Sequence, residues 1–207
     1  MIEIVKPMDI EKRSFEIITE LLGDRQLDPE TEPVVKRVIH TTADFDYADS
    51  LHFSEHAVRR GVEALRAGCD IVTDTQMARS GINKTILSRL GGQVHCFMSD
   101  ADVAEEARER GVTRAIVSME RAANLKKPCI FAIGNAPTAL LALRELMDAG
   151  RVIPALIVGV PVGFVNVVES KETIIASGAP CIVARGRKGG SNVAAAICNA
   201  MLYQIER

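Results

Sequence analysis

The alternation of short apolar runs with helical patterns after Gly68 constrains the fold of this chain more than any other feature. Each run has four to six residues and ends in a polar or glycine-rich turn; the runs are DIVT (70–73), QVHCF (93–97), CIFAI (129–133), ALIVGV (155–160) and CIVA (181–184). Continuous apolar character is typical of strands buried on both faces, and strands that alternate with helices need crossover connections. The pattern predicts an α/β fold with a mainly parallel central sheet of about five strands flanked by helices.

The residues before this alternation have the apolar spacing of helices. Three segments follow that spacing: 8–23, 28–40 and 54–68. The residues predicted to cap them are Asp9, Asp28 and Ser54. With 207 residues and 47% hydrophobic content, the chain can bury one sizeable core. We expect a single α/β domain over residues 1–207, helical in 1–68 and built from βα units in 69–207.

The composition disfavours several classes of partner. A net charge of −2 and a pI near 6.1 give neither nucleic acid nor a membrane surface an electrostatic reason to hold the protein. The five cysteines lie far apart without a CxxC pair, so buried reduced thiols are expected rather than a zinc site. Residues 1–14 lack the apolar run of roughly 7 to 15 residues found in signal peptides. No segment has the about 18 apolar residues of a membrane span, so we expect a cytoplasmic protein.

Ligands of open α/β sheets bind at the carboxyl ends of the strands, where loops meet helix N-termini. The loops predicted there are rich in Gly, Asn, Ser and Pro: 74–83, 98–102, 134–138, 161–170 and 185–192. Arg185 and Arg187 precede a helix N-terminus, which suits a carboxylate or phosphate, although a turn with solvated charges has the same composition. Asn135 either caps the next helix or contacts a ligand. A Walker sequence and a GxGxxG fingerprint are both absent, which disfavours ATP and dinucleotides.

The histidines differ in what their positions predict. His52 and His56 have the spacing of two metal ligands on a helix, but no third ligand is evident, so no metal site is expected. His95 lies in an apolar run and is expected to be a hydrogen-bonded core residue. His40 lies near a predicted helix end, with Arg37 one turn before it. His40 is therefore either a charged helix cap or, without a partnered nucleophile or metal, a proton-transfer residue.

Six stretches, taken together and in this order, resemble a known family. They are RSF (13–15), RVIHTTADFD (37–46), TDTQMARSGINK (73–84), GNAPTAL (134–140), GVPVGFVNVVESK (159–171) and GRKGGSNVAAAICNA (186–200). This chain resembles the precorrin-8X methylmutases, also called precorrin isomerases, of cobalamin biosynthesis. The resemblance extends over nearly the whole chain, apart from residues 117–127.

The resemblance implies an intramolecular transferase that moves a methyl group from carbon 11 to carbon 12 of precorrin-8 or cobalt-precorrin-8, giving hydrogenobyrinate or cobyrinate. The acid–base histidine of the family falls on His40, and its substrate-contacting serine and arginine fall on Ser14 and Arg37. No redox cofactor or methyl donor is implied, and any cobalt would be carried in the substrate. Three stretches look closer to the anaerobic branch, which favours cobalt-precorrin-8: HTTADFD (40–46), SGINK (80–84) and RKGGSNVAAA (187–196).

A corrinoid is a large, flat, apolar ring rimmed with carboxylates, and arginine forms charge-assisted bonds with such groups. The expected substrate-binding residues are Ser14, Arg37, Arg114, Asn135, Arg185 and Arg187. The resemblance also implies a homodimer with the active site in a cleft that involves both subunits.

Two other functions are compatible with the sequence. The first is a non-catalytic carrier that uses the same loops to bind and pass on a corrinoid. The second is an unrelated nucleotide-using α/β enzyme, which only the βα pattern and the glycine turns suggest.

Overall fold

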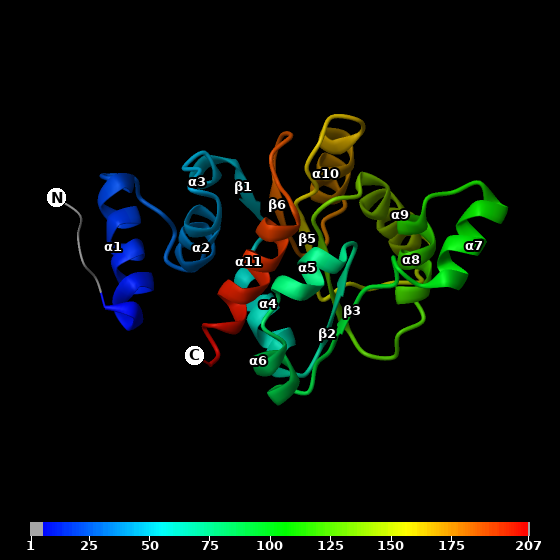
Figure 1. The fold of residues 1–207 in the computed structure, drawn as a ribbon. Coiled ribbons are helices and arrows are strands. Elements are labelled where there is room, and N and C mark those ends of the chain that lie inside the picture. The colour runs from blue at the N-terminus through cyan, green and yellow to red at the C-terminus, as the bar shows by residue number, and fades with distance from the viewer. Residues whose placement is uncertain (1–5, 207) are drawn as a thin grey trace.

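The computed structural model describes residues 6–206 and contains one six-stranded sheet (Figure 1). Residues 1–5, which belong to the stretch considered for a targeting signal, and residue 207 lie outside the described residues. The strands are β1 (Leu51–Phe53), β2 (Asp70–Thr73), β3 (Val94–His95), β4 (Cys129–Ile133), β5 (Leu156–Gly159) and β6 (Cys181–Ala184). They lie in the order β1-β6-β5-β4-β2-β3, and all neighbours are parallel except β1 and β6. The predicted mainly parallel sheet is thus confirmed.

Helices cover both faces of the sheet, because its central strands are apolar on both sides. In β4, Ile130 and Ala132 face one core, whereas Phe131 and Ile133 face the other. The first face is covered by α4 (Ala57–Arg66), α5 (Gln76–Gly81), α6 (Lys84–Arg89) and α11 (Ser191–Leu202). The second face is covered by α8 (Arg114–Ala122), α9 (Pro137–Asp148) and α10 (Val167–Ala176), and α7 (Ala101–Arg110) packs on α8.

Three further helices form an outer layer beyond α11. The helix α2 (Glu32–Thr42) packs mainly against α11, and α1 (Ile10–Leu22) packs against α2. A 3-10 turn, η1 (Pro7–Asp9), precedes α1, and α3 (Tyr47–Ser50) follows α2. Figure 1 shows α1 at one end of the molecule, with α2 between it and α11. The residues nearest the start of the chain are therefore attached to the sheet through α11.

The predicted helix caps are wrong, because these side chains bond elsewhere or make no capping bond. Asp9 precedes α1, but its side chain accepts no capping hydrogen bond. The carboxylate of Asp28 accepts the amide of Glu30 at 2.8 Å in a tight turn, and α2 begins four residues beyond Asp28. Ser54 Oγ accepts the amide of Cys181 at 2.9 Å and so supports the sheet rather than α4.

The predicted helical character of residues 1–68 is wrong for residues 51–53, which form β1. This strand pairs antiparallel with β6, with His52 opposite Val183. The sheet therefore has six strands rather than about five. At the other edge, β3 covers only two of the five residues predicted in QVHCF.

The segment 74–83, predicted as a loop, folds largely into α5 and continues into α6. Thr75 Oγ1 accepts the amide of Ala78 at 3.0 Å, and Asn83 Oδ1 accepts the amide of Ile86 at 3.1 Å. Each of these side chains satisfies one of the free amides in the first turn of a short helix, that of its third residue. Within residues 6–206, no helix is long and apolar enough to cross a bilayer.

Candidate active site

Four loops pack together at the carboxyl edge of the sheet. Thr75 Oγ1, after β2, lies 2.7 Å from Ser191 Oγ, at the start of α11. Gly134, after β4, approaches the same segment so closely that an added Cβ would lie 2.7 Å from Ser191 Cα. The amide of Gly190 donates to the carbonyl oxygen of Val160, after β5, at 2.9 Å. The loops after β2, β4, β5 and β6 therefore form one continuous edge.

Asp74 joins the loop after β2 to the loop after β4. Its buried carboxylate accepts the amides of Gly134, Asn135 and Ala136 at 2.8, 2.8 and 2.6 Å. Burial raises the pKa of Asp74, and the three amide bonds oppose that shift. The carboxylate thus satisfies amides that precede α9. Asn135 does not cap α9 and is exposed at the sheet edge, which leaves ligand contact as its predicted role.

The loop of residues 185–190 carries two of the predicted arginines to this edge. Arg185 and Arg187 are both exposed, and the Arg187 guanidinium lies over the Phe164 ring, 5.8 Å from its centroid. Phe164 is 81% exposed, and the neighbouring Val165 is 78% exposed. Cationic side chains therefore lie beside an exposed apolar surface, a combination that suits an apolar ring with anionic substituents.

Lys188 links the same loop to the end of α2. Its ammonium group donates to the carboxylates of Asp44 and Asp46, both at 2.6 Å. The hydrogen bond from Lys188 lowers the pKa of Asp44. Because Asp44 lies one turn beyond His40, this link places the loop of residues 185–190 next to the end of the helix that carries His40.

His40 lies exposed in the last turn of α2. Its imidazole stacks on the Phe15 ring of α1, with ring centroids 5.3 Å apart and an interplanar angle of 3°. Among the described residues, none forms a hydrogen bond with the imidazole. It opens on a cavity of about 280 Å³, the His40 hollow, lined by Ser14, Ile17, Ile18, Leu21, Ile39, His40, Ala43 and Phe45. Both ring nitrogens are thus available to a ligand.

Ser14 lies in the same hollow, and Arg37 lies beside it. Ser14 Oγ donates to the carbonyl oxygen of Ile10 at 2.9 Å, which leaves its oxygen free to accept. The Arg37 guanidinium lies between two aromatic rings, 4.7 Å from the centroid of Phe15 and 5.1 Å from that of Tyr203. Phe15 therefore contacts both His40 and Arg37 and fixes their relative positions.

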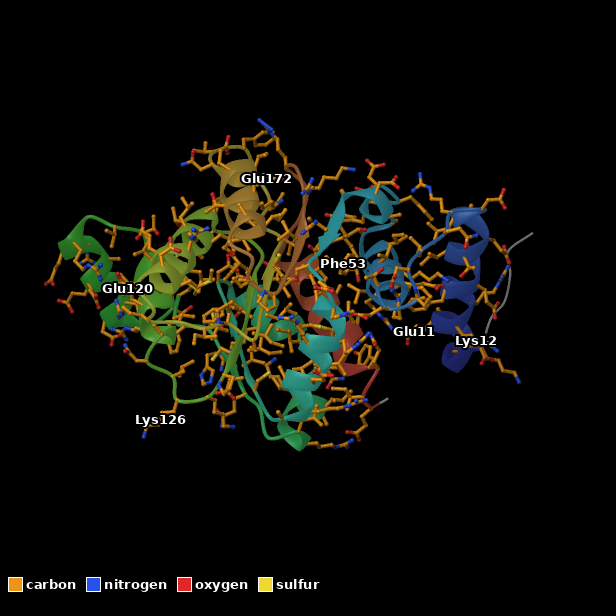
Figure 2. The ribbon with its side chains drawn as sticks, turned by 180° about the vertical axis from the view of Figure 1, so that it is seen from behind. Glu11, Lys12, Phe53, Glu120, Lys126 and Glu172 are labelled. Carbon is orange, nitrogen blue, oxygen red and sulfur yellow. The ribbon has the colours of Figure 1, made fainter. Side chains whose placement is uncertain are left out.

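The carboxylate of Glu11 pairs with Arg37 at 2.5 Å. In Figure 2, Glu11 lies on the side of α1 that faces α2, as this ion pair requires. A second cavity of about 410 Å³ opens beside this pair and is lined by Lys12, Phe15, Glu32, Pro33, Lys36, Arg37, Ala200, Tyr203 and Gln204. Arg37 is thus oriented by two rings and one carboxylate.

Arg114 is not brought to His40 within the chain. It begins α8, on the face of the sheet opposite to α11 and α2 (Figure 1). Thr113, which precedes it, shares a hydrogen bond of 3.0 Å with Thr138 of α9. Arg114 therefore lies near the carboxyl end of β4 but on the other side of the sheet.

The remaining histidines lie outside this region. His95 Nε2 lies 2.9 Å from a carboxylate oxygen of the buried Asp70, which confirms a hydrogen-bonded position for His95. His52 lies on β1, and His56 precedes α4 with a positive φ of 55°. Among residues 6–206, no group of three or more His, Cys, Asp and Glu side chains has the arrangement of a metal site.

Sequence reasoning missed three residues of this region. The sequence identifies Phe15 only as an apolar residue of the first predicted helix and as part of RSF, although an aromatic residue next to Ser14 is a signal that it could stack on a neighbouring helix. Asp74 directly follows a buried strand, which is a signal for a role at the carboxyl edge. Lys188 lies between Arg187 and the pair Gly189–Gly190, but its partners are 144 and 142 residues away in the chain, so no local pattern identifies them.

Comparison with known proteins gives the same family over almost the whole chain. The model of the precorrin-8X methylmutase family matches residues 9–204. A cobalt-precorrin-8 methylmutase of Salmonella typhimurium is 47% identical over 98% of this chain and 97% of its own length. Another from Priestia megaterium is 46% identical over 95% of this chain and 88% of its own length.

A solved structure is similar over the same range. The precorrin-8x methyl mutase of Thermus thermophilus superimposes with a TM-score of 0.86 and 38% sequence identity, covering 94% of this chain and 96% of that one. A precorrin-8X methylmutase of Pseudomonas aeruginosa is 40% identical in sequence over 95% of both chains. The similarity therefore includes the layer with α1 and α2 as well as the sheet.

Proposed function

The chain belongs to the precorrin-8X methylmutase family, and we propose that its substrate is cobalt-precorrin-8 and that His40 is its acid–base residue. The protein is an isomerase of cobalamin biosynthesis, an intramolecular transferase that moves a methyl group within its substrate. One observation supports the role of His40 most directly. Its imidazole is exposed beside Ser14 in the His40 hollow, is held by the Phe15 ring and has both nitrogens available.

The proposed reaction moves the methyl group from carbon 11 to carbon 12 of the macrocycle. His40 donates a proton to the conjugated macrocycle, the methyl group migrates with its bonding electrons, and the proton returns to His40. Substrate and product then have the same atoms and the same charge. No redox cofactor or methyl donor takes part in this proposal, and cobalt enters only as part of the substrate.

The proposed contacts with the ring carboxylates come from two sides of the carboxyl edge. Arg37 lies next to His40, and Lys188 ties the loop with Arg185 and Arg187 to the same helix end. Asn135 and Ser14 offer further polar contacts. Arg114 lies on the opposite face of the sheet, so its proposed contact requires a ligand that extends across the edge.

A cobalt-containing substrate is supported by the names of the relatives. The relatives from Salmonella typhimurium and Priestia megaterium, at 47% and 46% identity, are named for cobalt-precorrin-8. The relative from Pseudomonas aeruginosa, at 40% identity, is named for precorrin-8X without cobalt. We therefore expect faster turnover of cobalt-precorrin-8 than of metal-free precorrin-8.

We also propose that the protein is a homodimer with its active site at the subunit cleft. The His40 hollow, at about 280 Å³, falls below the roughly 300–1,000 Å³ of typical pockets for drug-sized ligands, and a corrinoid is larger than those. Ile10, Ile17 and Leu21 of α1 are 53, 38 and 66% exposed, and the last two line the hollow. A second subunit against α1 would cover these side chains and enlarge the site.

A cytoplasmic location is proposed on the basis of the cysteines. All five are buried and free, which suits a reducing compartment.

The function is tested by the visible spectrum of cobalt-precorrin-8 over time, because the methyl shift changes ring conjugation. Wild type should convert the substrate, and His40→Ala should bind it without conversion. His56→Ala is the matched control, since His56 is also exposed but lies before α4, outside the His40 hollow. Equal conversion by wild type and His40→Ala would remove His40 from the chemistry. If wild type, His40→Ala and His56→Ala all bind the substrate and none of them converts it, the corrinoid carrier is favoured.

A further inference from the structure

Lys171 of α10 is the one lysine among the described residues that is fully buried, with 0% of its surface exposed. Its ammonium group donates to the carbonyl oxygens of Gly186 and Lys188, both at 2.8 Å. Among the described residues, no carboxylate pairs with it. Burial lowers the pKa of Lys171 to about 8. A cation kept in the interior by carbonyl groups alone is costly, so its position needs an explanation beyond packing.

The two carbonyls belong to the loop that carries the proposed substrate arginines. The carbonyl oxygen between them, that of Arg187, accepts the amide of Gly163 at 3.2 Å. Three consecutive carbonyls are therefore bonded to groups outside the loop. Gly189 adds a steric limit, because a Cβ there would lie 2.1 Å from the carbonyl oxygen of Val160. The backbone of residues 186–189 is thus held along its length, while the side chains of Arg187 and Lys188 stay exposed.

The loop lies between α10 and the end of α2. Lys171 holds it from the side of α10, and Lys188 pairs with Asp44 and Asp46 on the other side. The amide of Arg185 donates to the carbonyl oxygen of Ser50, at the end of α3, at 2.8 Å. Figure 1 shows the turn after β6 between α10 and α3 at one edge of the molecule. A shift of this backbone would therefore move cationic side chains relative to His40.

We propose that Lys171 is a positioning residue. Its buried ammonium group fixes the backbone of residues 186–188 and thereby places the Arg187 guanidinium where it can bind a carboxylate of the corrinoid. This inference rests on the proposed function for the identity of the ligand. Lys171 does not touch the ligand. An apolar residue in its place leaves two carbonyls without a donor, and the loop then moves to a position in which water can donate to them.

The first test measures the loop itself by hydrogen exchange in Lys171→Met, whose side chain has a similar length and no charge. The amides of Gly163 and Gly190 report on the loop, since they bond to Arg187 and Val160. Their exchange should accelerate in Lys171→Met. Ile174→Ala is the matched control, because Ile174 is also 0% exposed on α10 but contributes to the apolar core. If both variants accelerate exchange at these amides equally, or neither does, the proposal is wrong.

The second test titrates wild type and variants with cobyrinic acid, the product expected of the reaction, in a His40→Ala background that cannot turn over. Lys171→Met should weaken binding by about 10-fold to 100-fold, within the range caused by small displacements of positioned groups. Ile174→Ala should change the Kd for cobyrinic acid by no more than about twofold relative to the His40→Ala parent, at a temperature at which both proteins are folded. Arg187→Ala should remove most of the additional effect of Lys171→Met, because coupled residues are not additive. Additive losses, or unchanged binding in Lys171→Met, would overturn the proposal.

The two tests separate this inference from the proposed function. A wild-type protein that neither binds cobyrinic acid nor converts cobalt-precorrin-8 contradicts the proposed function, while hydrogen exchange still decides whether Lys171 fixes the loop. If Lys171→Met does not fold, Lys171→Gln is used in the same experiments. Its shorter side chain keeps N–H donors but cannot reach both carbonyls, so the same acceleration and loss of binding are expected.

Discussion

Replacing Asp74 with asparagine tests whether one buried carboxylate holds two loops of the site together. Asp74 Oδ1 accepts the amide of Gly134, and Oδ2 accepts those of Asn135 and Ala136. An asparagine has one oxygen, so its best orientation keeps the two bonds at the Oδ2 position. Its NH₂ group then faces the Gly134 amide, and two donors oppose each other in a buried position.

The expected cost follows from these contacts. An unsatisfied buried amide costs about 1–3 kcal/mol, and each of the two remaining bonds loses about 1 kcal/mol when its acceptor is no longer charged. Removing the buried charge offsets part of this, since burial already raises the pKa of Asp74. We expect the free energy of unfolding to fall by about 3 kcal/mol, which lowers Tm by about 6–12 °C in a chain of this size.

Thermal unfolding followed by circular dichroism, together with urea denaturation, measures this change. Asp28→Asn is the matched control, because Asp28 is exposed and uses a single oxygen to accept the amide of Glu30. Asparagine can make the same bond, so the Tm of Asp28→Asn should stay within about 2 °C of that of wild type, as for most surface substitutions. If Asp74→Asn has the same Tm as Asp28→Asn, the Asp74 carboxylate does not hold the loop after β4.

Two further predictions concern the surface of the site. Leu21→Lys should convert the proposed dimer into monomers in analytical ultracentrifugation, because it places a charge among the exposed apolar side chains of α1. Arg25→Lys, nearby, keeps the charge and should leave the dimer intact. A monomeric wild type would contradict the subunit proposal. Lys188→Met should return the lowered pKa of Asp44 to its ordinary value. The ion pair between Lys188 and Asp44 stabilises the fold at neutral pH, and this stabilisation is lost as the pH falls through the lowered pKa of Asp44. An NMR titration that gives the same pKa for Asp44 in wild type and Lys188→Met would disprove this prediction.

The central strands could be predicted because their composition allows few alternatives. All residues of β2, β4, β5 and β6 are buried; β4, β5 and β6 contain no polar side chain, and β2 has two apolar residues between Asp70 and Thr73. The edge strands were harder. β1 has the sequence LHF and gains its structure from pairing with β6, so nothing in three residues distinguishes it from a loop.

Helix starts were predicted less well because a cap depends on a partner that the local sequence does not contain. Ser54 has the residue type of a cap, yet its hydroxyl accepts the amide of Cys181, 127 residues later. Thr75 and Asn83 do cap helices, and they have the same kind of side chain. Only the tertiary contacts of each side chain distinguish Ser54, which does not cap a helix, from Thr75 and Asn83, which do.

The candidate site was predicted in its location more than in its contacts. Four of the five loops expected at the carboxyl edge, those after β2, β4, β5 and β6, pack together, because parallel strands place their carboxyl ends at one edge. The roles of His40, Ser14 and Arg37 came from the family resemblance and stay predictions. Nothing in the sequence distinguishes Lys171 from an exposed lysine, since burial of a lysine cannot be recognised from sequence spacing.

The attachment of α2 and β1 also has a consequence for the order in which the chain can fold during translation. β1 pairs with β6, about 130 residues later, and α2 packs on α11, which follows β6. At about 5–20 residues per second, the ribosome needs roughly 7 to 26 s to supply these partners. During that interval the apolar face of α2, with Val34, Val38 and Ile39, has no sheet-bound surface to cover it. A nascent chain that stalls before residue 181 therefore contains His40 but lacks β6 and α11, which hold α2 in its native position. The exposed apolar face of α2 is then a surface to which chaperones can bind.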